Sequence, residues 1–301
     1  MNKSFSLVKR GFSYSWKPKM PKHQIVIDEK SYRAPHPIWH LKDAENVEIT
    51  HLKPNTIKDY LALGVVKFFR KTFDFFTHYN PGKMNEKMYI RRCIFLETIA
   101  GVPGMIGGMM RHLRALRLLR EDGGWIHHLL EEAENERMHL LTFLKVRQPG
   151  ISMRVAILFT QAFFICFYSP LYIISPKTAH RFVGYLEEEA VKTYTNCIKE
   201  LDDGKLPMFK TLETPKEAIE YWGLSEKATF RDVLLSIRAD EVLHREFNHH
   251  FANIDQDEKI SGHKFVSRRE VKWDDVMEPL AKSSTKPQNV DAKESNDAVK
   301  H

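Results

Sequence analysis

The chain has 301 residues, 43% of them apolar, and a formal net charge of +7. This length and apolar content suffice for a full hydrophobic core in one large or two small domains. The three cysteines form no Cys-x-x-Cys pair, so neither a disulfide framework nor a thiolate zinc site is expected. The basic balance suits nucleic acid or an anionic membrane surface. Nucleic-acid binding is not expected, because no basic patch with interleaved aromatics occurs beyond the N-terminal arm.

Residues 1–54 are predicted to form an extended N-terminal arm, because helical periodicity is weak there and proline is frequent. Residues 1–27 contain no acidic side chain, and their basic residues are mixed with serines and aromatics. This composition is typical of an organelle transit peptide. A basic terminus without a targeting role is the alternative interpretation.

Residues 55–254 are predicted to form a helical domain, since apolar residues recur there with helical period. Turn motifs such as Asn80-Pro81-Gly82 separate the segments, and no segment shows the alternation of a strand. Residues 255–301 are polar and are predicted to be a largely disordered tail. Helices are expected at 56–79, 85–119, 124–147, 153–174, 178–201 and 229–253, with a short one within 214–222.

Two Glu-x-x-His motifs lie on separate predicted helices: Glu136/His139 and Glu241/His244. Residues three apart share one face of a helix, so each motif can present a carboxylate and an imidazole to the same metal ion. Two such motifs, together with one Glu from each of two other helices, form the ligand set of ferritin-like di-iron proteins. The sequence therefore predicts an all-α fold built around a ferritin-like four-helix di-iron bundle.

The first of the two remaining carboxylates is found by helical phase in the segment 178–201. Glu187 lies on an apolar stripe that also holds Tyr194, and a buried acid needs a partner. Its neighbours Glu188 and Glu189 point away from this stripe, so both are expected on the solvated face. Glu187 is therefore the candidate ligand of this helix.

The second carboxylate is Glu97, in the segment 85–119. Gly101, Gly104 and Gly108 follow on its face of the helix. Because glycine destabilises a helix by about 1 kcal/mol per residue, such a row indicates that another group must approach closely. A buried ion pair with Arg92 is the alternative role for Glu97.

Four buried carboxylates carry four negative charges, which two divalent cations would neutralise. Carboxylate and imidazole ligands without thiolates suit iron or manganese. We therefore expect two iron ions; a helical bundle with ordinary acidic faces is the alternative. The candidate ligands are Glu97, Glu136, His139, Glu187, Glu241 and His244.

Three further residues are candidates for supporting roles around the metals. Asn135 and Asp240 each precede a ligand glutamate, and a carboxylate such as Asp240 can hold a ligand imidazole through its free N–H. Tyr194 can donate an electron and a proton to an oxygen intermediate. The alternative for Tyr194 is a core tyrosine whose hydroxyl is hydrogen-bonded.

Residues 155–176 contain no charged side chain, and by length they qualify as a membrane-spanning helix. However, candidate ligands lie on helices both before and after this segment. A single crossing would leave them on opposite sides of the bilayer. We therefore expect this helix to pack in the core, to lie in one leaflet, or to line a dimer contact.

Four long motifs occur in order along the chain: LETIAGVPGM at 96–105, NERMHL at 135–140, LEEEA at 186–190 and RADEVLH at 238–244. Shorter ones occur at 46–51 and 180–185. Together they extend over about residues 43–252. They resemble the motifs of the mitochondrial alternative oxidases, which are cyanide-insensitive ubiquinol oxidases.

The resemblance implies a di-iron enzyme bound to one leaflet of the inner mitochondrial membrane, or to that of a related organelle. It would oxidise ubiquinol and reduce oxygen to water without pumping protons. Family members are homodimers, and the helices at 56–79 and 153–174 would supply the apolar membrane-facing surface. Glu136 and Glu241 would bridge the irons, and Tyr194 would be the redox-active tyrosine. The residues that match the quinol pocket are Arg70, Arg92, Leu96, Ala190 and Thr193.

Two alternative functions are compatible with the same ligands. One is a di-iron hydroxylase that acts on a quinone precursor or a lipid, and the other is a non-catalytic iron-binding bundle or membrane scaffold. Plant alternative oxidases carry a regulatory cysteine before the first helix. The earliest cysteine here is Cys93, inside the helical region, so disulfide control between subunits is not expected.

Overall fold

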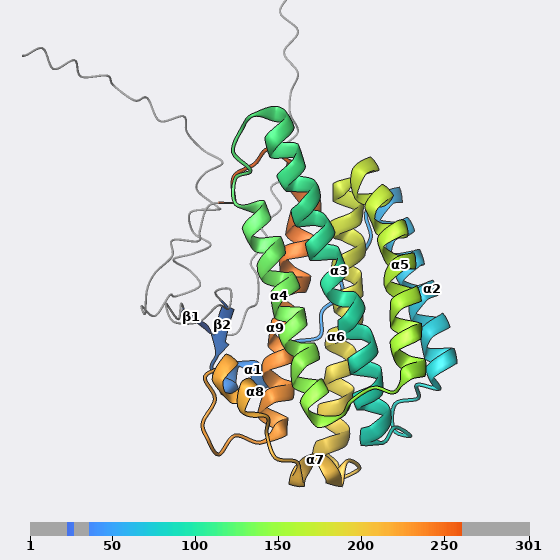
Figure 1. The fold of residues 1–301 in the computed structure, drawn as a ribbon, viewed down its shortest axis with the longest axis vertical. Coiled ribbons are helices and arrows are strands. Elements are labelled where there is room, and N and C mark those ends of the chain that lie inside the picture. The colour runs from blue at the N-terminus through green and yellow to red at the C-terminus, as the bar shows by residue number, and fades with distance from the viewer. Residues whose placement is uncertain (1–22, 27–35, 261–301) are drawn as a thin grey trace, which may run out of the picture.

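The structure is a computed structural model that describes residues 23–26 and 36–260. Four long helices form a central bundle (Figure 1): α3 (Glu86–Leu118), α4 (Trp125–Val146), α6 (Pro176–Asp202) and α9 (Phe230–Asn253). Helix α3 packs along α4, and α6 packs along α9. The predicted all-α bundle is confirmed.

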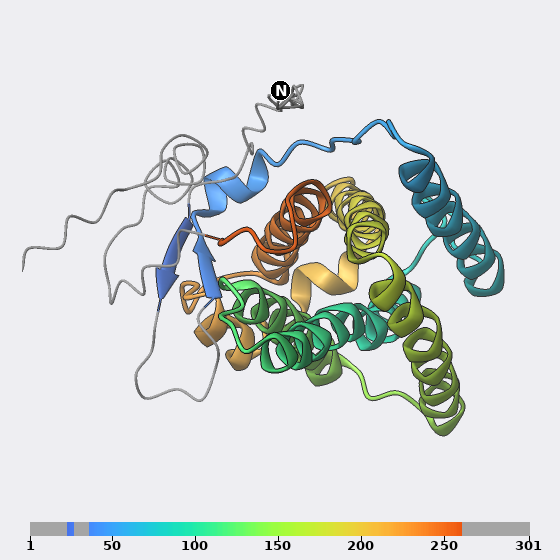
Figure 2. The same cartoon turned by 90° about the horizontal axis from the view of Figure 1, so that it is seen from above.

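Helices α2 (Ile57–Thr77) and α5 (Ile151–Ile174) lie outside this bundle, on one side of it (Figure 2). Helix α5 packs on α3 and α6, and α2 packs on α6. By length and hydropathy, α3 and α5 qualify as membrane spans among the described helices, but only 17% of the most apolar window of α5 is buried. Large exposed apolar side chains on α2 and α5 include Ile57, Leu61, Phe68, Phe75, Phe76, Ile151, Leu158, Phe159, Phe163 and Ile174.

The sequence determines where the long helices begin. Thr56 and Asp59 form a capping box at the start of α2, and Thr229 and Asp232 form another at the start of α9. Pro176 is the first residue of α6, where its missing N–H costs no hydrogen bond. The predicted bounds of these helices agree with the structure to within two residues.

The glycine row predicted beside Glu97 brings α3 and α4 close together. A Cβ atom at Gly104 would lie 2.5 Å from the backbone oxygen of Leu129, and one at Gly101 would lie 3.4 Å from that of Ala133. Any side chain at Gly104 would therefore push the two helices apart. Because Glu97 precedes this row by one turn, the glycines also set its distance from the ligands of α4.

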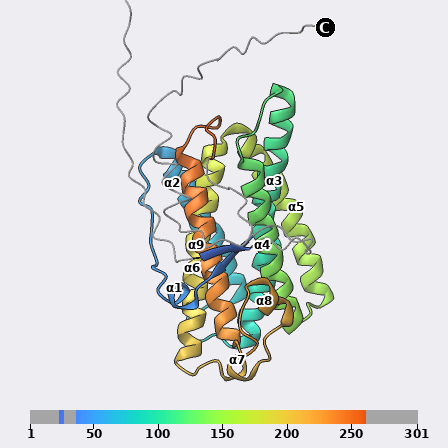
Figure 3. The ribbon, with the colours of Figure 1, turned by 90° about the vertical axis from the view of Figure 1, so that its left-hand side faces the viewer.

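The sequence suggested an extended N-terminal arm, and the described part of this arm contains short regular elements as well. Strand β1 (His23–Val26) pairs antiparallel with β2 (His36–Trp39), and α1 (Leu41–Glu45) follows. Strands of four residues are too short to show a clear alternation, so the sequence did not reveal this pairing. Both β2 and α1 pack on α9, on the side of the bundle away from α2 and α5 (Figures 2 and 3).

Two shorter helices, α7 (Pro207–Thr211) and α8 (Lys216–Tyr221), connect α6 to α9. At the other end of the bundle, residues 255–260 pack against α3 and the turn before α4. The backbone N–H of Ile260 donates to the Gly123 carbonyl at 2.8 Å. Most of the predicted targeting segment and most of the predicted tail lie outside the described residues.

Candidate metal centre

Two overlapping groups of buried side chains meet at the centre of the bundle. One group is Glu97, Glu136, His139 and Glu241, and the other is Glu136, Glu187, Glu241 and His244. Within each group, one candidate ligand atom from every residue lies within 4.8 Å of the others. The groups share Glu136 and Glu241. These two carboxylates therefore lie between two candidate ion positions, where bridging ligands would be.

Each imidazole directs its Nδ1 atom at the carboxylates. His139 Nδ1 lies 3.3 Å from Glu97, 3.4 Å from Glu136 and 3.5 Å from Glu241. His244 Nδ1 lies 2.8 Å from Glu136 and 3.7 Å from Glu241. The i, i+3 spacing thus brings each histidine beside the glutamate of its own motif, as expected for residues on one helix face.

Several of these buried atoms have no hydrogen-bond partner within the described part of the chain. They include both carboxylate oxygens of Glu136, one oxygen each of Glu97 and Glu241, and the Nδ1 atoms of both histidines. Unpaired buried polar atoms are strongly destabilising. All of these atoms face one another, and their number and chemistry suit two hard divalent cations. The residues present therefore fit a two-metal site.

The electrostatics of the cluster lead to the same conclusion. Burial raises the pKa of Glu97 well above its usual value, and repulsion from Glu136 adds to the rise. Burial and repulsion from Glu241 and Glu136 raise the pKa of Glu187 in the same way. The pKa of Glu136 is lowered in spite of burial, because the imidazoles of His139 and His244 lie beside its carboxylate and favour the charged form. Without cations, the cluster must therefore hold protons that cations would displace.

Asp240 joins the cluster to its surroundings. Its carboxylate accepts hydrogen bonds from the indole N–H groups of Trp39 at 2.5 Å and Trp222 at 2.9 Å. It also accepts one from the amide of Asn135 at 3.0 Å. Its Oδ2 atom lies 3.1 Å from His139 Nε2, the ring nitrogen that points away from the carboxylates. A carboxylate in this position orients the ring and makes the imidazole a better ligand.

Tyr194 contacts the cluster from α6. Its hydroxyl donates to a carboxylate oxygen of Glu97, and the side chain is buried. Burial raises the pKa of Tyr194 well above its usual value, so the phenol stays protonated. A protonated phenol that is hydrogen-bonded to a candidate ligand can give up its proton along that bond when it is oxidised.

Comparison with known proteins identifies the family. The family model described as "Alternative oxidase" matches residues 39–253. The chain belongs to the alternative oxidase family. It is 53% identical over 229 residues to the mitochondrial alternative oxidase of Trypanosoma brucei brucei, covering 76% of this chain and 69% of the relative. It is 45% identical over 273 residues to that of Emericella nidulans (87% and 74%) and 48% identical over 250 residues to that of Ajellomyces capsulatus (78% and 70%).

A cavity of about 870 Å³ extends from the cluster of candidate metal ligands to the outer helices. Residues of α2, α3, α5 and α6 line it, and Glu97, Glu187 and Tyr194 lie at its inner end. The lining includes the five residues that the family resemblance matches to a quinol pocket: Arg70, Arg92, Leu96, Ala190 and Thr193.

The polar groups of the cavity wall are held by one another. The Arg70 guanidinium donates to Thr193 Oγ1 at 2.8 Å and to Asp74 at 2.7 Å. Arg92 donates to the other oxygen of Asp74 at 2.6 Å and to Thr77 at 3.0 Å. Arg92 therefore pairs with Asp74 and is not the partner of Glu97, which was the alternative considered from the sequence.

Glu188 does not lie on a solvated face, so this expectation was wrong. Its side chain is 2% exposed, and it accepts hydrogen bonds from the Leu52 backbone N–H at 2.9 Å and from the rings of His51 at 2.6 Å and His249 at 3.0 Å. The segment that leads into α2 covers this face of α6. Helical phase correctly separated Glu188 from the metal cluster but could not reveal the covering segment.

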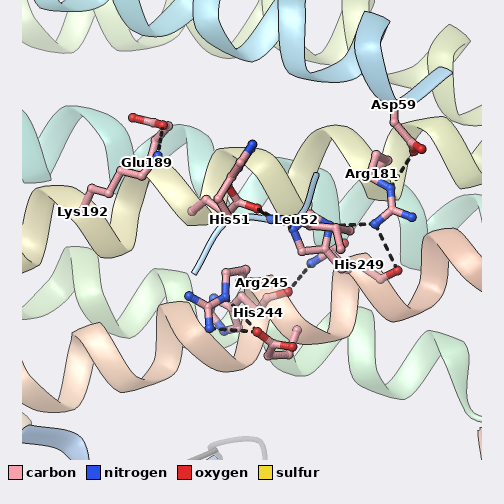
Figure 4. A network of polar contacts seen from close by, with 12 residues as sticks. His51, Leu52, Asp59, Arg181, Glu189, Lys192, His244, Arg245 and His249 are labelled. Carbon is pink, nitrogen blue, oxygen red and sulfur yellow. Dashed lines mark hydrogen bonds and ion pairs between the residues drawn. The ribbon is translucent and has the colours of Figure 1, made fainter. Parts of the chain in front are cut away.

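The polar network around Glu188 continues to the start of α2 (Figure 4). Arg181 donates to His249 Nδ1 at 2.9 Å and to Asp59 at 2.8 Å. Because His249 Nδ1 accepts a hydrogen bond from Arg181, the other ring nitrogen, Nε2, carries the hydrogen and donates to Glu188. The network therefore ties the N-terminal turn of α2 to α6 and α9.

Sequence reasoning missed one buried acid near the candidate metal ligands, Glu132. It lies on α4 one turn before Glu136 and accepts a hydrogen bond from Asn248 at 2.8 Å. Burial raises the pKa of Glu132 to about 7. Its i, i+4 spacing from Glu136 was the available signal, since such residues share a helix face. No pattern in the sequence indicated the hydrogen bond from Trp39 to Asp240, because this bond depends on how the N-terminal arm packs against α9.

Proposed function

We propose that this alternative oxidase oxidises ubiquinol and reduces oxygen to water at a di-iron centre, without pumping protons. The observation that carries the proposal is the cavity. It joins the guanidinium groups of Arg70 and Arg92 to the inner carboxylates Glu97 and Glu187. A single bound quinol can therefore contact hydrogen-bond donors while its ring approaches the metal cluster.

Six side chains would hold the two irons. Glu136 and Glu241 would bridge them, and Glu97, Glu187, His139 and His244 would bind terminally. When bound, the irons supply the redox chemistry that passes electrons from quinol to oxygen. Asp240 would keep the His139 ring oriented throughout the cycle. Tyr194 would supply one of the four electrons that reduce oxygen to water, with its proton moving to the Glu97 oxygen that its hydroxyl already contacts, and a quinol would return the electron and the proton.

The quinol head group needs hydrogen-bond partners for its hydroxyl oxygens. Arg92 is buried, lines the cavity, and its Nε–H has no acceptor among the described residues. Its N–H would donate to one quinol oxygen, and Thr193 and Arg70 would lie beside the same end of the ring. Leu96 and Ala190 would contact the ring faces. The apolar tail would leave between α2 and α5, whose side chains line the outer cavity.

The outer faces of α2 and α5 support attachment to one leaflet of a membrane. Both helices lie on one side of the bundle (Figure 2), and both carry large exposed apolar side chains. A crossing by α5 would separate the ligands of α3 and α4 from those of α6 and α9. With both helices in one leaflet, quinol can enter from the lipid without any path for protons across the bilayer. Relatives named as mitochondrial enzymes support a place at the inner mitochondrial membrane.

A homodimer is part of the proposal. The second half of α3 carries a row of exposed apolar side chains that the outer helices do not cover: Met105, Met109, Leu113 and Leu116. Their spacing of three or four residues makes one stripe, which suits helix packing between two copies. The mass of the purified protein, measured by light scattering, should be that of two chains.

Oxygen uptake by the purified, iron-loaded chain tests the function. With a soluble ubiquinol analogue and cyanide present, we expect two quinols to be consumed per oxygen and no oxygenated product. An oxygenated product would indicate the hydroxylase alternative, and iron binding without oxygen uptake would indicate the non-catalytic bundle. Replacement of Glu136 by Ala should abolish both iron binding and activity. Glu134→Ala is the matched control, because Glu134 pairs with Arg137 on the outer side of the same helix.

A further inference from the structure

Two guanidinium groups lie side by side in the wall of the cavity and share one carboxylate. Arg70 and Arg92 donate to different oxygens of Asp74, at 2.7 and 2.6 Å. The Arg92 side chain is only 1% exposed. Burial lowers the pKa of Arg92, and repulsion from Arg70 lowers it further. Arg70 has a second carboxylate, Glu189, at 3.6 Å. Within the described part of the chain, Arg92 forms an ion pair with Asp74 alone, so this buried cation needs a further source of electrostatic stabilisation.

The ring of Tyr79 supplies this second source. The central guanidinium carbon lies 4.0 Å from the ring centroid in Arg92 and 5.0 Å in Arg70. Both distances fall within the range of a cation–π interaction, in which the negative face of an aromatic ring attracts a cation. Phe73 lies 4.7 Å from Arg92 as well, but only Tyr79 contacts both cations among the described aromatic rings.

The backbone at the end of α2 determines where this ring lies. His78 adopts the left-handed conformation with φ of 53°, and the chain reverses there. The N–H of Tyr79 then donates to the Asp74 carbonyl at 2.9 Å, as in a Schellman C-cap. Asn196 donates to the Tyr79 hydroxyl at 3.3 Å from α6. The carbonyl and the carboxylate of Asp74 therefore hold the ring and the two cations in one assembly.

We propose that Tyr79 is a positioning residue for the quinol head group. Its ring holds Arg92 and Arg70 in place, so that the unpartnered Nε–H of Arg92 stays available to a quinol oxygen. This role rests on the proposed quinol oxidation. Tyr79 itself is not among the side chains that line the cavity, so it acts through the guanidinium groups.

Substitution at this position separates the ring face from the hydroxyl. In the iron-loaded full chain, Tyr79→Leu should raise the KM for a soluble ubiquinol analogue roughly 2- to 30-fold, which is the range expected from a lost cation–π interaction. The value of kcat and the iron content should not change. Tyr79→Phe, which keeps the ring face, should stay within about twofold of the parent protein. An equal rise in KM in both variants would assign the effect to the hydrogen bond between Asn196 and the Tyr79 hydroxyl, and it would overturn the proposal.

A fluorinated series tests the electrostatics without changing the shape of the core. Phenylalanine with one, two and three ring fluorines at position 79 withdraws charge from the ring face in steps. The KM should rise with each fluorine, and the Kd of an oxidised quinone analogue for the metal-free protein should rise in parallel. If neither the KM nor the Kd changed with the number of fluorines, the role of Tyr79 would be overturned. Absence of quinol oxidation by the parent protein would instead overturn the proposed function.

Discussion

Glu187 and Glu188 are adjacent in the chain and equally buried, at 3% and 2% exposure, yet their surroundings are opposite. Glu188 accepts hydrogen bonds from two histidine rings and a backbone N–H, and these bonds lower its pKa in spite of burial. Glu187 faces other carboxylates, and burial and repulsion raise its pKa. The protein therefore neutralises one acid with its own donors and leaves the other to be neutralised by cations. A buried acid is therefore a candidate metal ligand when it lacks hydrogen-bond donors around it; burial alone does not indicate one.

The largest expected effect follows from exchanging each acid for its amide. Glu187→Gln should lose iron and oxygen uptake, because the second ion position then lacks a terminal carboxylate. Glu188→Gln should keep its iron, since the Glu188 carboxylate is hydrogen-bonded to His51, Leu52 and His249 and, within the described residues, to none of the candidate metal ligands. Iron analysis of both purified variants measures the difference. Equal iron loss in the two would contradict the contrast between these neighbours.

A smaller effect is expected behind the cluster, at Asp240. Asp240→Asn keeps the shape of the side chain but weakens its hold on the His139 ring. Loss of such an outer carboxylate typically lowers metal affinity about 10- to 100-fold. Competition with a chelator of known affinity measures this change. A metal affinity equal to that of the parent protein would show that the negative charge of Asp240 is not needed to orient the His139 ring, and that the side chain held by Trp222 and Asn135 is enough.

The pH dependence of stability should separate the two acids in the metal-free protein. The raised pKa values of Glu97 and Glu187 mean that the folded state binds protons that the unfolded state releases. Their contribution is therefore present at low pH and lost as pH rises above about 4.3, the unperturbed value. Glu188, with a lowered pKa, contributes stability above that value and loses it as pH falls.

Thermal unfolding of the metal-free chain between about pH 5 and 8 should show this trend, with the midpoint falling as pH rises. The carboxylates and imidazoles must be deprotonated to bind metal, so added iron should stabilise the protein most at the higher pH. In Glu187→Gln the midpoint should fall less steeply with pH than in the parent protein, whereas in Glu188→Gln the fall should not become less steep. A midpoint that rises with pH in the metal-free protein would refute this account.

The smallest effect is expected at the exposed edge of the Glu188 network. The His51 side chain is 43% exposed, so His51→Ala removes a donor that water can partly replace. The free energy of unfolding should fall by about 1 kcal/mol, with no change in iron content. Denaturant unfolding of the iron-loaded chain measures it. Replacement of His249, which is buried beside the same carboxylate, should cost more.

The long helices and the six candidate ligands could be predicted because their signals are local. Helical period, capping residues and the Glu-x-x-His spacing all lie within a few residues of one another. The surroundings of Glu188 could not be predicted in the same way. Its donors His51 and His249 come from segments 137 and 61 residues away. Helical phase shows which way a side chain points, but not which distant segment covers it.

The same limit applies to the N-terminal arm. Proline content suggested an extended segment, but nothing near Trp39 in the sequence indicates that its indole contacts Asp240. The identity of the buried acid Glu132, by contrast, was within reach, because its spacing from Glu136 is one helical turn. Non-local contacts, more than weak local patterns, account for what the sequence left undetermined.

The bond between Trp39 and Asp240 joins residues 201 positions apart, and this separation has a consequence for how the molecule assembles. Closing so long a loop carries a large entropic cost, so contacts of this kind tend to form late. The arm is synthesised first, yet it has no surface to dock on until α9 has been made and has folded. A chain that ends before α9 should therefore leave the arm undocked, and it should also be unable to retain the metal, because α9 carries Glu241 and His244.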